Sequence, residues 1–426
     1  MKLISHVLFF TFFAFAAVGQ ARTWTQQSTG RTIEADFVRT AGANVVLKMK
    51  GREVTVPVTM LVPEDIEFIR GQSQPQSSPS AAAGADTNSG SAYLGPNRNG
   101  AVTTGKTWNW ETDEPKILWQ TPVGEGHSST VVDANNNLYT QGWDKSQNRE
   151  VVYAIDAITG EIEWTCETTP ARMHYDHGSG ATPAIDGNRI YALHNSGQLL
   201  CINAENGDRV WATHLIQDHG GQPHDWGYAG TPLVAGDVVI VDAGGSGSST
   251  IAFNKTNGEP VWASGDFPAG YASPIPAEVS GKDAVLVFKY EQLVALDISS
   301  GRELFEYPKP GQIGHAIPTP ILSEDGDSVF FGQEKISLGA SPRQRWQIER
   351  QNFLNTPSLH AGHLYDMSDR NANGPLVCRD FDSGEVVWTE SSITGPGDTL
   401  VVDNTLVVYL QSGELIIGNA SPDGFN

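Results

Sequence analysis

The sequence predicts an all-β protein: a seven-bladed β-propeller with four-stranded blades, preceded by a small β-barrel domain. The first of two repeated phrases runs from Ala154 to Trp164 and contains two short strands around an Asp-x-x-Thr-Gly turn. It returns at Cys201–Trp211, Ala252–Trp262, Ala295–Phe305 and Cys378–Trp388. A period of about 40–50 residues indicates an array of supersecondary units. The last step is about twice as long as the others, which predicts a degenerate copy that ends at Trp346.

Each copy of this phrase has the chemistry of a hairpin. The aspartate, such as Asp156, can accept hydrogen bonds from the turn amides, and the glycine four residues later, Gly160, permits a positive φ. A single hairpin cannot bury its own apolar face. Repeated hairpins therefore favour a radial arrangement in which each unit packs on the next.

A second phrase marks the first strand of each blade, and it occurs seven times. Its copies are Ser129–Val132, Thr182–Ile185, Thr231–Val234, Ser273–Pro276, Thr319–Leu322, Thr356–Leu359 and Asp398–Val401. Seven aromatic plugs accompany them: Trp119, Trp164, Trp211, Trp262, Phe305, Trp346 and Trp388. Because Trp119 precedes the first complete unit, we expect a Lys116–Val123 strand to pair beside Glu414–Ile417 and close the ring. Such closure removes exposed edge strands.

The repeated A-x-D-x-x-T-G-x-x-x-W phrase resembles the repeat of pyrroloquinoline-quinone (PQQ) type propellers over about residues 92–420. The segment Tyr93–Gly100 resembles the start of the secreted bacterial branch of that family. The resemblance implies a propeller domain at residues 92–426. The family contains quinone-dependent dehydrogenases and also many propellers that bind no quinone, so the fold alone does not give the function.

The N-terminal part reads as a secretory signal over residues 1–21. Lys2 is followed by an apolar run from Leu8 to Val18, and small residues end at Ala21. This predicts a periplasmic or secreted protein. No later stretch reaches about 18 apolar residues, so we expect no membrane span.

Residues 22–72 alternate like short strands and then show a helix start at Pro63-Glu64-Asp65. Together with Arg22-Thr23-Trp24-Thr25, they resemble the SLA-type homology domain one, a small β-barrel that binds short peptide motifs in endocytic adaptors. Residues 73–91 are almost entirely Gln, Ser, Pro, Ala and Gly, which predicts a flexible linker.

Charge narrows the range of partners. The formal net charge is −22, which argues against nucleic acid and anionic membrane surfaces, because both attract basic patches. Protein, peptide and glycan partners stay open. Of the three cysteines, Cys201 and Cys378 occupy a repeat position held elsewhere by alanine, and we expect them to be small buried residues.

The candidate site is a set of polar and aromatic residues that lie before successive first strands. Connections of this kind gather at one mouth of a propeller channel, where imidazoles, phenols and carboxylates could bind a ligand. Alternatively, these side chains hydrogen-bond the loop backbones and fill the mouth. The set is His127, His174, Asp176, His177, His224, Asp225, Tyr228, Tyr271 and His315.

A second candidate is a calcium loop at Asp369, Asn371 and Asn373, although a polar hairpin turn gives the same pattern. We expect no bound cofactor, with PQQ and Ca²⁺ as the alternatives. Quinone dehydrogenases of this fold usually show a vicinal cysteine pair, which the sequence lacks. The leading hypothesis is a non-catalytic binding or scaffold protein. The alternatives are a PQQ-dependent oxidoreductase and a metal-dependent hydrolase at the histidine cluster.

Overall fold

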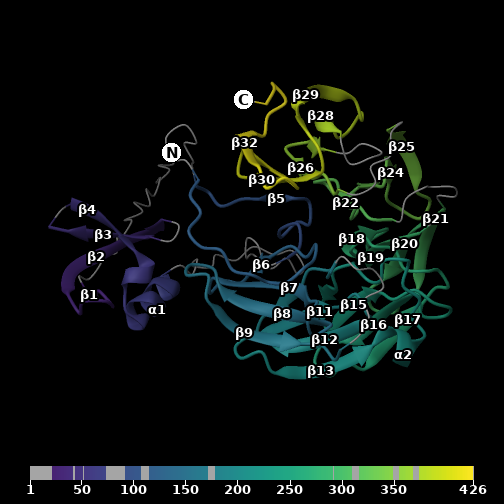
Figure 1. The fold of residues 1–426 in the computed structure, drawn as a ribbon. Helices are drawn as coiled ribbons and strands as arrows, with labels where there is room; N and C mark the ends of the chain where they lie inside the picture. Colours follow the sequence, from purple (N-terminus) through teal and green to yellow (C-terminus); the bar gives the residue numbers. More distant parts are fainter. Residues whose placement is uncertain are drawn as a thin grey trace, which may run out of the picture. The chain divides into compact units, whose positions relative to one another are not determined.

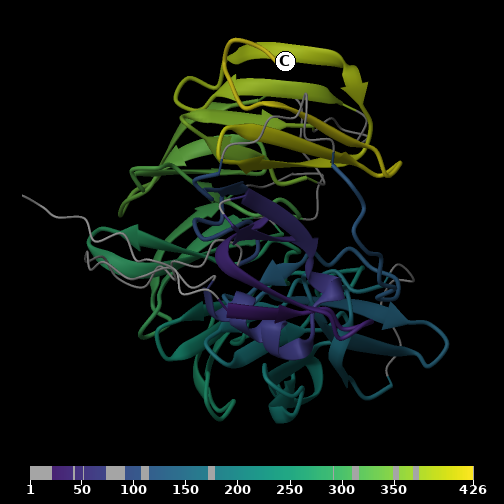
Figure 2. The same cartoon turned by 90° about the vertical axis from the view of Figure 1, so that its left-hand side faces the viewer.

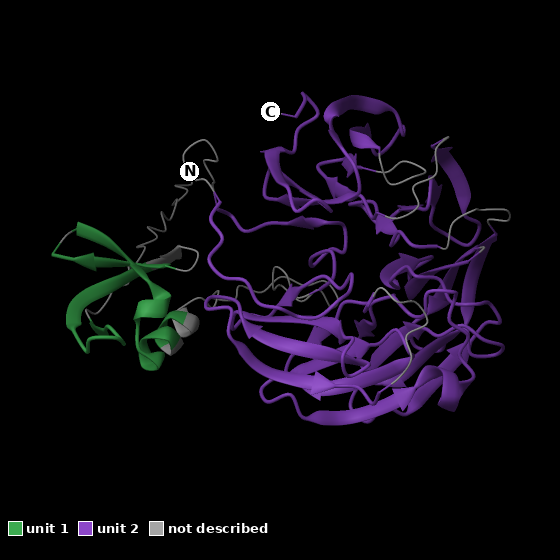
Figure 3. Ribbon diagram, viewed as in Figure 1, with its two compact units in different colours: residues 1–75 green, residues 76–426 purple. Residues whose placement is uncertain are grey.

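The structure, a computed structural model, describes residues 22–41, 44–50, 52–72, 92–106, 115–170, 178–290, 292–308, 316–348, 355–367 and 374–425. The chain divides into two compact units, residues 1–75 and 76–426 (Figure 3). Over the described ranges, no helix has the length and apolar character needed to cross a membrane.

Over its described residues, the N-terminal unit is an antiparallel meander with one α-helix. Its strands follow chain order: β1 (Arg22–Thr25), β2 (Thr32–Ala41), β3 (Asn44–Met49) and β4 (Arg52–Pro57). A 3-10 turn, η1 (Val58–Met60), leads to α1 (Pro63–Gln72), which begins at the predicted residue. The Arg22 guanidinium of β1 lies 3.9 Å from the Phe68 ring centroid and 2.7 Å from Asp65 Oδ1. Because Asp65 and Phe68 belong to α1, these contacts connect β1 to the helix.

In the residues that the structure describes, the second unit is all-β apart from one short helix, α2 (Leu215–His219). Its described strands form seven four-stranded sheets, which Figure 1 shows following one another in chain order around an arc. The first three sheets are β6 (Val131–Val132), β7 (Asn137–Asp144), β8 (Arg149–Asp156), β9 (Ile162–Glu167); β10 (Ala184–Asp186), β11 (Arg189–Leu193), β12 (Gln198–Asn203), β13 (Arg209–His214); and β14 (Leu233–Ala235), β15 (Val238–Asp242), β16 (Thr250–Asn254), β17 (Pro260–Ser264).

Three more sheets repeat the same antiparallel order, and Figure 2 shows them from a second direction. They are β18 (Ile275–Val279), β19 (Lys282–Lys289), β20 (Gln292–Asp297), β21 (Glu303–Pro308); β22 (Ile321–Leu322), β23 (Ser328–Phe331), β24 (Glu334–Ser337), β25 (Arg343–Gln347); and β26 (Ser358–His360), β27 (His363–Asp366), β28 (Pro375–Asp380), β29 (Val386–Thr394). The seventh sheet has β30 (Gly397–Val402), β31 (Thr405–Leu410), β32 (Leu415–Asn419) and β5 (Ala101–Val102). The arrangement is propeller-like.

The plug tryptophans join each sheet to the next, as the repeated phrase predicts. Trp164 Nε1 donates to the Ala204 carbonyl at 2.9 Å, and its ring lies so close to Gly207 that a Cβ there would approach it to 2.8 Å. Gly207 has a φ of 76°, which disfavours any side chain. The same donor geometry recurs at Trp119, Trp211, Trp262, Trp346 and Trp388.

Hydroxyl side chains join the first strands of successive sheets. The Ser129 amide donates to the Thr182 hydroxyl at 2.9 Å, and the Thr182 amide donates to that of Thr231 at 3.2 Å. The series continues through Ser273, Thr319 and Thr356. The Ser/Thr positions of the second phrase therefore link neighbouring sheets at their inner strands.

The predicted closing pair is wrong. The last strand, β32, pairs with β31, and residues 115–124 form no strand with it. In its place β5 pairs in parallel with β30 at the other edge of the sheet. The segment makes two side-chain hydrogen bonds: Trp119 Nε1 donates to the Ala157 carbonyl, as the plug pattern predicts, and the Thr121 hydroxyl donates to the Gly160 carbonyl. They hold this segment against the β8–β9 turn, and Ile117 stays 80% exposed.

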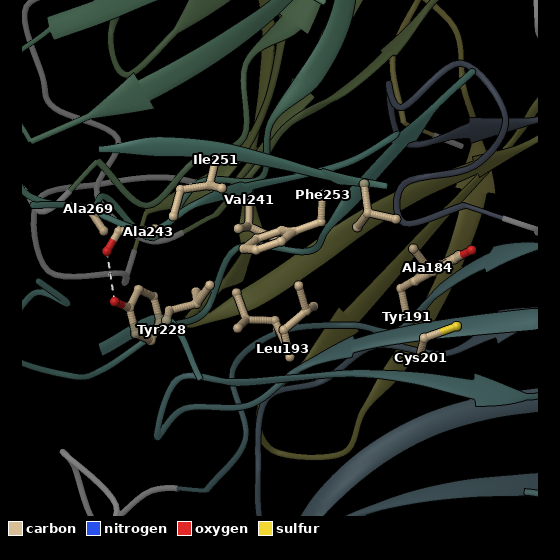
Figure 4. Close-up of a cluster of buried hydrophobic side chains, with 14 of the residues drawn as sticks. Ala184, Tyr191, Leu193, Cys201, Tyr228, Val241, Ala243, Ile251, Phe253 and Ala269 are labelled. Carbon is tan, nitrogen blue, oxygen red and sulfur yellow. Dashed lines mark hydrogen bonds between the residues drawn. The ribbon is translucent and has the colours of Figure 1, made fainter. Parts of the chain in front are cut away.

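The hydrophobic core between the second and third sheets also includes residues of the connecting loops, such as Tyr228. Figure 4 shows Leu193, Val241, Phe253 and Tyr228 packed together there. The three cysteines are buried free thiols. Cys201 and Cys378 are fully buried within strands, as their repeat position predicts.

Candidate recognition site

Strand order places several loops on one face of the second unit. In a four-stranded antiparallel sheet, the connection to the next sheet and the turn between strands two and three lie at the same end. We call this end the connection face. It carries the β13–β14 and β17–β18 connections and the β11–β12 and β19–β20 turns.

Four ring side chains meet on the connection face and form what we call the aromatic cluster: His224, Trp226, Tyr271 and Tyr290. Trp226 stacks on Tyr271 with centroids 5.2 Å apart, and His224 stacks on Tyr290 at 4.9 Å. His224 and Tyr271 meet edge to face at 5.6 Å. The rings come from three separate loops, so the fold brings together residues far apart in sequence.

The Tyr271 hydroxyl makes polar contacts with two other members of this cluster. It accepts the Trp226 backbone N–H at 2.8 Å and lies 3.0 Å from His224 Nδ1. Burial, with the nearby Asp225 carboxylate, raises the pKa of Tyr271 to about 12, and the Trp226 hydrogen bond opposes the shift. The hydroxyl therefore keeps its proton at neutral pH and can donate it to His224.

Asp225 sits at the solvent side of the cluster. Its side chain is 78% exposed, whereas that of His224 is 15% exposed, and Asp225 Oδ2 lies 3.7 Å from His224 Nδ1. Trp226 and Tyr290 are half-buried. The arrangement presents aromatic carbon beside one carboxylate.

A buried polar group supports the Trp226 side of the cluster. The Asn195 side-chain amide donates to the Trp226 carbonyl, and the Tyr228 amide donates to the Asn195 carbonyl at 3.1 Å. The Asn195 amide in turn donates to the Glu150 carboxylate at 3.0 Å. His194 Nδ1 lies 3.7 Å from the same carboxylate, which also accepts the Ser179 hydroxyl at 2.8 Å.

The Glu150 carboxylate is ionised despite its burial. Burial alone would raise its pKa, but the His194 imidazole and the hydrogen bonds from Asn195 and Ser179 outweigh burial and lower it. Glu150 belongs to the first sheet and Asn195 to the second, so a buried charge positions the loop that leads to the third.

A buried ion pair supports the tyrosine side. Lys289 Nζ lies 2.5 Å from Asp242 Oδ1 and donates to the Ser249 carbonyl at 3.1 Å. The other Asp242 oxygen accepts the Gly270 amide at 2.8 Å. Burial raises the pKa of Asp242 and lowers that of Lys289, and their mutual attraction opposes both shifts. Gly270 precedes Tyr271 and Lys289 precedes Tyr290 in the chain, so the pair positions both tyrosines.

Tyr228 lies apart from this surface. It is fully buried, and its hydroxyl donates to the Ala243 carbonyl at 2.7 Å (Figure 4). Gly227, with a φ of 82°, turns the chain so that Tyr228 enters the core. Its role is therefore the packing of two sheets.

His127 belongs to a different group near the inner strands. Desolvation of the Asp398 carboxylate raises its pKa, and the nearby exposed His127 imidazole opposes that shift. Asp398 acts with burial to raise the pKa of Tyr93 to about 12, while hydrogen bonds to Thr319 and Thr356 oppose the shift. Tyr93 thus reaches the series of inner-strand hydroxyls.

The remaining predicted residues lie outside the described residues: His174, Asp176, His177, His315, Asp369, Asn371 and Asn373. Over the ranges that the structure does describe, no group of three His, Cys, Asp or Glu side chains could hold a metal ion.

Sequence reasoning did not select Trp226, Tyr290, Asn195 or Glu150. Trp226 follows the selected pair His224 and Asp225, and its place in the same loop was a usable signal. Tyr290 lies in a turn between strands, where no repeated phrase marks it. Asn195 and Glu150 resemble ordinary turn and strand residues, and only their three-dimensional contacts reveal their role.

A quinone does not fit the cysteines of this chain. Quinone dehydrogenases of this fold usually show a vicinal cysteine pair, whereas Cys166, Cys201 and Cys378 are separate buried thiols in different strands.

Two family models match the chain. The one described as outer membrane protein assembly factor BamB, a PQQ-repeat model, matches residues 76–225 and 177–390. The one described as SLA1 homology domain 1 matches residues 14–76. Together they match residues 14–390, which include parts of both units.

Individual relatives are distant. The outer membrane protein assembly factor BamB of Salmonella typhimurium is 21% identical over 268 residues, 58% of this chain and 64% of that protein. Tetrathionate hydrolase of Acidithiobacillus ferrooxidans is 23% identical over 232 residues, 53% of this chain and 40% of that protein. The matches thus span less than two thirds of either relative.

Solved structures show the same fold at low identity. Quinohemoprotein alcohol dehydrogenase from Comamonas testosteroni has a TM-score of 0.53 and 15% identity over 70% of this chain and 66% of that one. The likeness supports a propeller-like fold and nothing about activity. On the family match over most of its length, the chain belongs to the PQQ-repeat family described as outer membrane protein assembly factor BamB, with an SLA1 homology domain 1 at its N-terminal end.

Proposed function

We propose that this protein is a non-catalytic, extracytoplasmic binding or scaffold protein that recognises a protein partner through its connection face. The observation that carries the proposal is the aromatic cluster, in which half-buried Trp226 and Tyr290 are held by hydrogen bonds and stacking. Partly exposed aromatic residues on rigid loops are typical anchors of protein interfaces. Their positions are fixed before binding, which reduces the entropy lost on association.

The family supports a protein partner. The relative from Salmonella typhimurium is named as an assembly factor for outer membrane proteins, a name that describes work on other proteins. In our proposal residues 1–21 are a signal peptide, residues 22–72 a small barrel, residues 73–91 a linker and residues 92–426 a seven-bladed propeller. Removal of the signal would leave the two domains in the periplasm or outside the cell.

Affinity capture tests this proposal. The full-length protein, made with its natural leader in cells that express it, would be captured with bound proteins after reversible crosslinking. The variants are His224→Ala, Trp226→Ala and Tyr290→Ala. We expect each to lose the same captured protein, with a cost of about 2 kcal/mol or more at the central anchor.

The control substitution lies on the opposite face. Asp208→Ala changes an exposed residue in a turn between third and fourth strands, and it should retain the captured protein. Equal capture by Trp226→Ala and Asp208→Ala would contradict the proposal.

A further inference from the structure

We propose that the aromatic cluster and Asp225 form a binding site for a cationic side chain, a lysine or arginine of the protein partner. The inference rests on the proposed function and adds the chemistry of the contact. It follows from which rings reach the surface, how they are held, and which charge lies beside them.

The rings provide the attractive surface. A cation is attracted to the negative face of an aromatic ring, most strongly to tryptophan and then to tyrosine. Trp226 and Tyr290 are both half-buried, and Tyr271 and His224 hold their rings by stacking, with centroids at most 5.2 Å apart. A lysine or arginine stem can also pack along the ring carbons while its charged head stays at the rim.

The carboxylate provides the charge. Asp225 extends into solvent beside His224, in the position from which it could pair with a charge above the rings. An exposed ion pair alone contributes little free energy, so the rings are needed to make the site. The chain also carries 49 acidic and 27 basic side chains, and the resulting field favours the approach of a cationic partner.

A sugar is the main competing ligand, since aromatic faces with a nearby carboxylate also bind glycans. The net charge of −22 favours the cation, because it attracts a charged partner and is indifferent to a neutral sugar. The two ligands differ in salt dependence: screening weakens binding of the cation and leaves the neutral sugar unaffected.

Titration of the full-length protein with three probes tests the site. The probes are N-acetyl-lysine methylamide, its neutral analogue N-acetyl-norleucine methylamide, and cellobiose. The readout is the indole N–H NMR signal of Trp226, identified from the spectrum of Trp226→Phe. We expect the lysine probe to shift this signal saturably and the norleucine probe to bind about fivefold more weakly or not at all. Added salt should weaken the binding of the lysine probe and leave the binding of the other two probes unchanged.

Substitutions locate the contact. Asp225→Asn removes the charge from an exposed side chain and preserves the fold, and we expect it to weaken the lysine probe about two- to fivefold. Tyr290→Leu should weaken it by a similar factor. Two control variants, Tyr409→Leu and Asp423→Asn, remove an exposed aromatic ring and an exposed carboxylate elsewhere on the unit. Neither should change the affinity for the lysine probe.

The outcomes separate this inference from the proposed function. Equal binding of lysine and norleucine probes, or a Trp226 shift with cellobiose alone, would overturn the cation site. If the partner protein is still captured through the connection face in that case, the proposed function stands and only its chemistry is wrong. If the protein neither binds the lysine probe selectively nor captures a partner through the connection face, both the cation site and the proposed function are overturned.

Discussion

The backbone amide of Asn195 donates a hydrogen bond to the carboxylate of Glu150 at 3.0 Å, across the boundary between two sheets. From the same residue, the side-chain amide reaches the Trp226 carbonyl in the next connection. A buried carboxylate in the first sheet thus positions half-buried Trp226 two loops away. The recognition site depends on these buried contacts, and the predictions below test them.

Asn195→Ala should loosen the loop that carries the aromatic cluster. The substitution leaves the Trp226 carbonyl without its side-chain donor, at a cost of about 1–3 kcal/mol in the free energy of unfolding. Denaturant unfolding and amide exchange of residues 224–228 would measure it. As a control, Asn206→Ala removes an exposed turn amide bonded to Asp208 and should cost about 0.5 kcal/mol or less. Equal losses for the two variants would contradict the role given to Asn195.

Glu150→Gln should change how stability depends on pH. The folded state lowers the pKa of Glu150, so the ionised group stabilises the fold above its ordinary pKa. That stability is lost as pH falls through the folded value. The difference between wild type and Glu150→Gln should therefore be largest near pH 7 and shrink below about pH 4. Unfolding curves measured across this range would show it, and a difference that grows on acidification would refute the assignment.

The Asp242–Lys289 pair should behave as a coupled unit. Lys289→Met leaves an uncompensated buried carboxylate and should cost about 3–5 kcal/mol, whereas Asp242→Leu combined with Lys289→Met should cost much less. A double-mutant cycle from unfolding midpoints measures the coupling. Additive losses would mean that the two residues do not depend on each other.

Trp211→Ala should destabilise the second unit by about 3–5 kcal/mol, because it empties a large aromatic site. Trp211 is nearly buried, and its indole N–H donates to the Lys255 carbonyl of the next sheet at 3.1 Å. Its neighbour Val210 is exposed, so Val210→Ala should stay within about 0.5 kcal/mol of wild type. Thermal or denaturant unfolding of both variants gives the comparison. A loss below about 1 kcal/mol for Trp211→Ala would show that the plug does not join the sheets.

The repeated phrases predicted the local structure well. Hairpin turns such as Asp156–Gly160, plugs such as Trp164 and inner-strand hydroxyls such as Thr182 depend on contacts that recur in every copy. The pairing of the Lys116–Val123 segment could not be predicted in this way. The Trp119 hydrogen bond follows the plug pattern, but no repeated phrase shows that this segment forms no strand beside β32 or that β5 pairs with β30.

The candidate site was predicted in part. A shared position before successive first strands selected His224 and Tyr271, which the structure brings to hydrogen-bonding distance. The same rule selected Tyr228, which Gly227 turns into the core. Position in a repeat predicts the end of the sheet at which a residue lies, but not whether its side chain points outward. That choice depends on local backbone angles and on buried partners such as Asn195.

The most direct test of the central claim is site-specific photocrosslinking in cells that express the protein. A photoreactive amino acid would replace Asp225 on the connection face or Asp208 on the opposite face, both exposed. We predict a crosslinked protein partner from position 225 that is absent from position 208. In the Trp226→Ala background, this crosslink should disappear. Crosslinks from position 208 alone, or a crosslink from position 225 that survives loss of Trp226, would contradict recognition through the aromatic cluster.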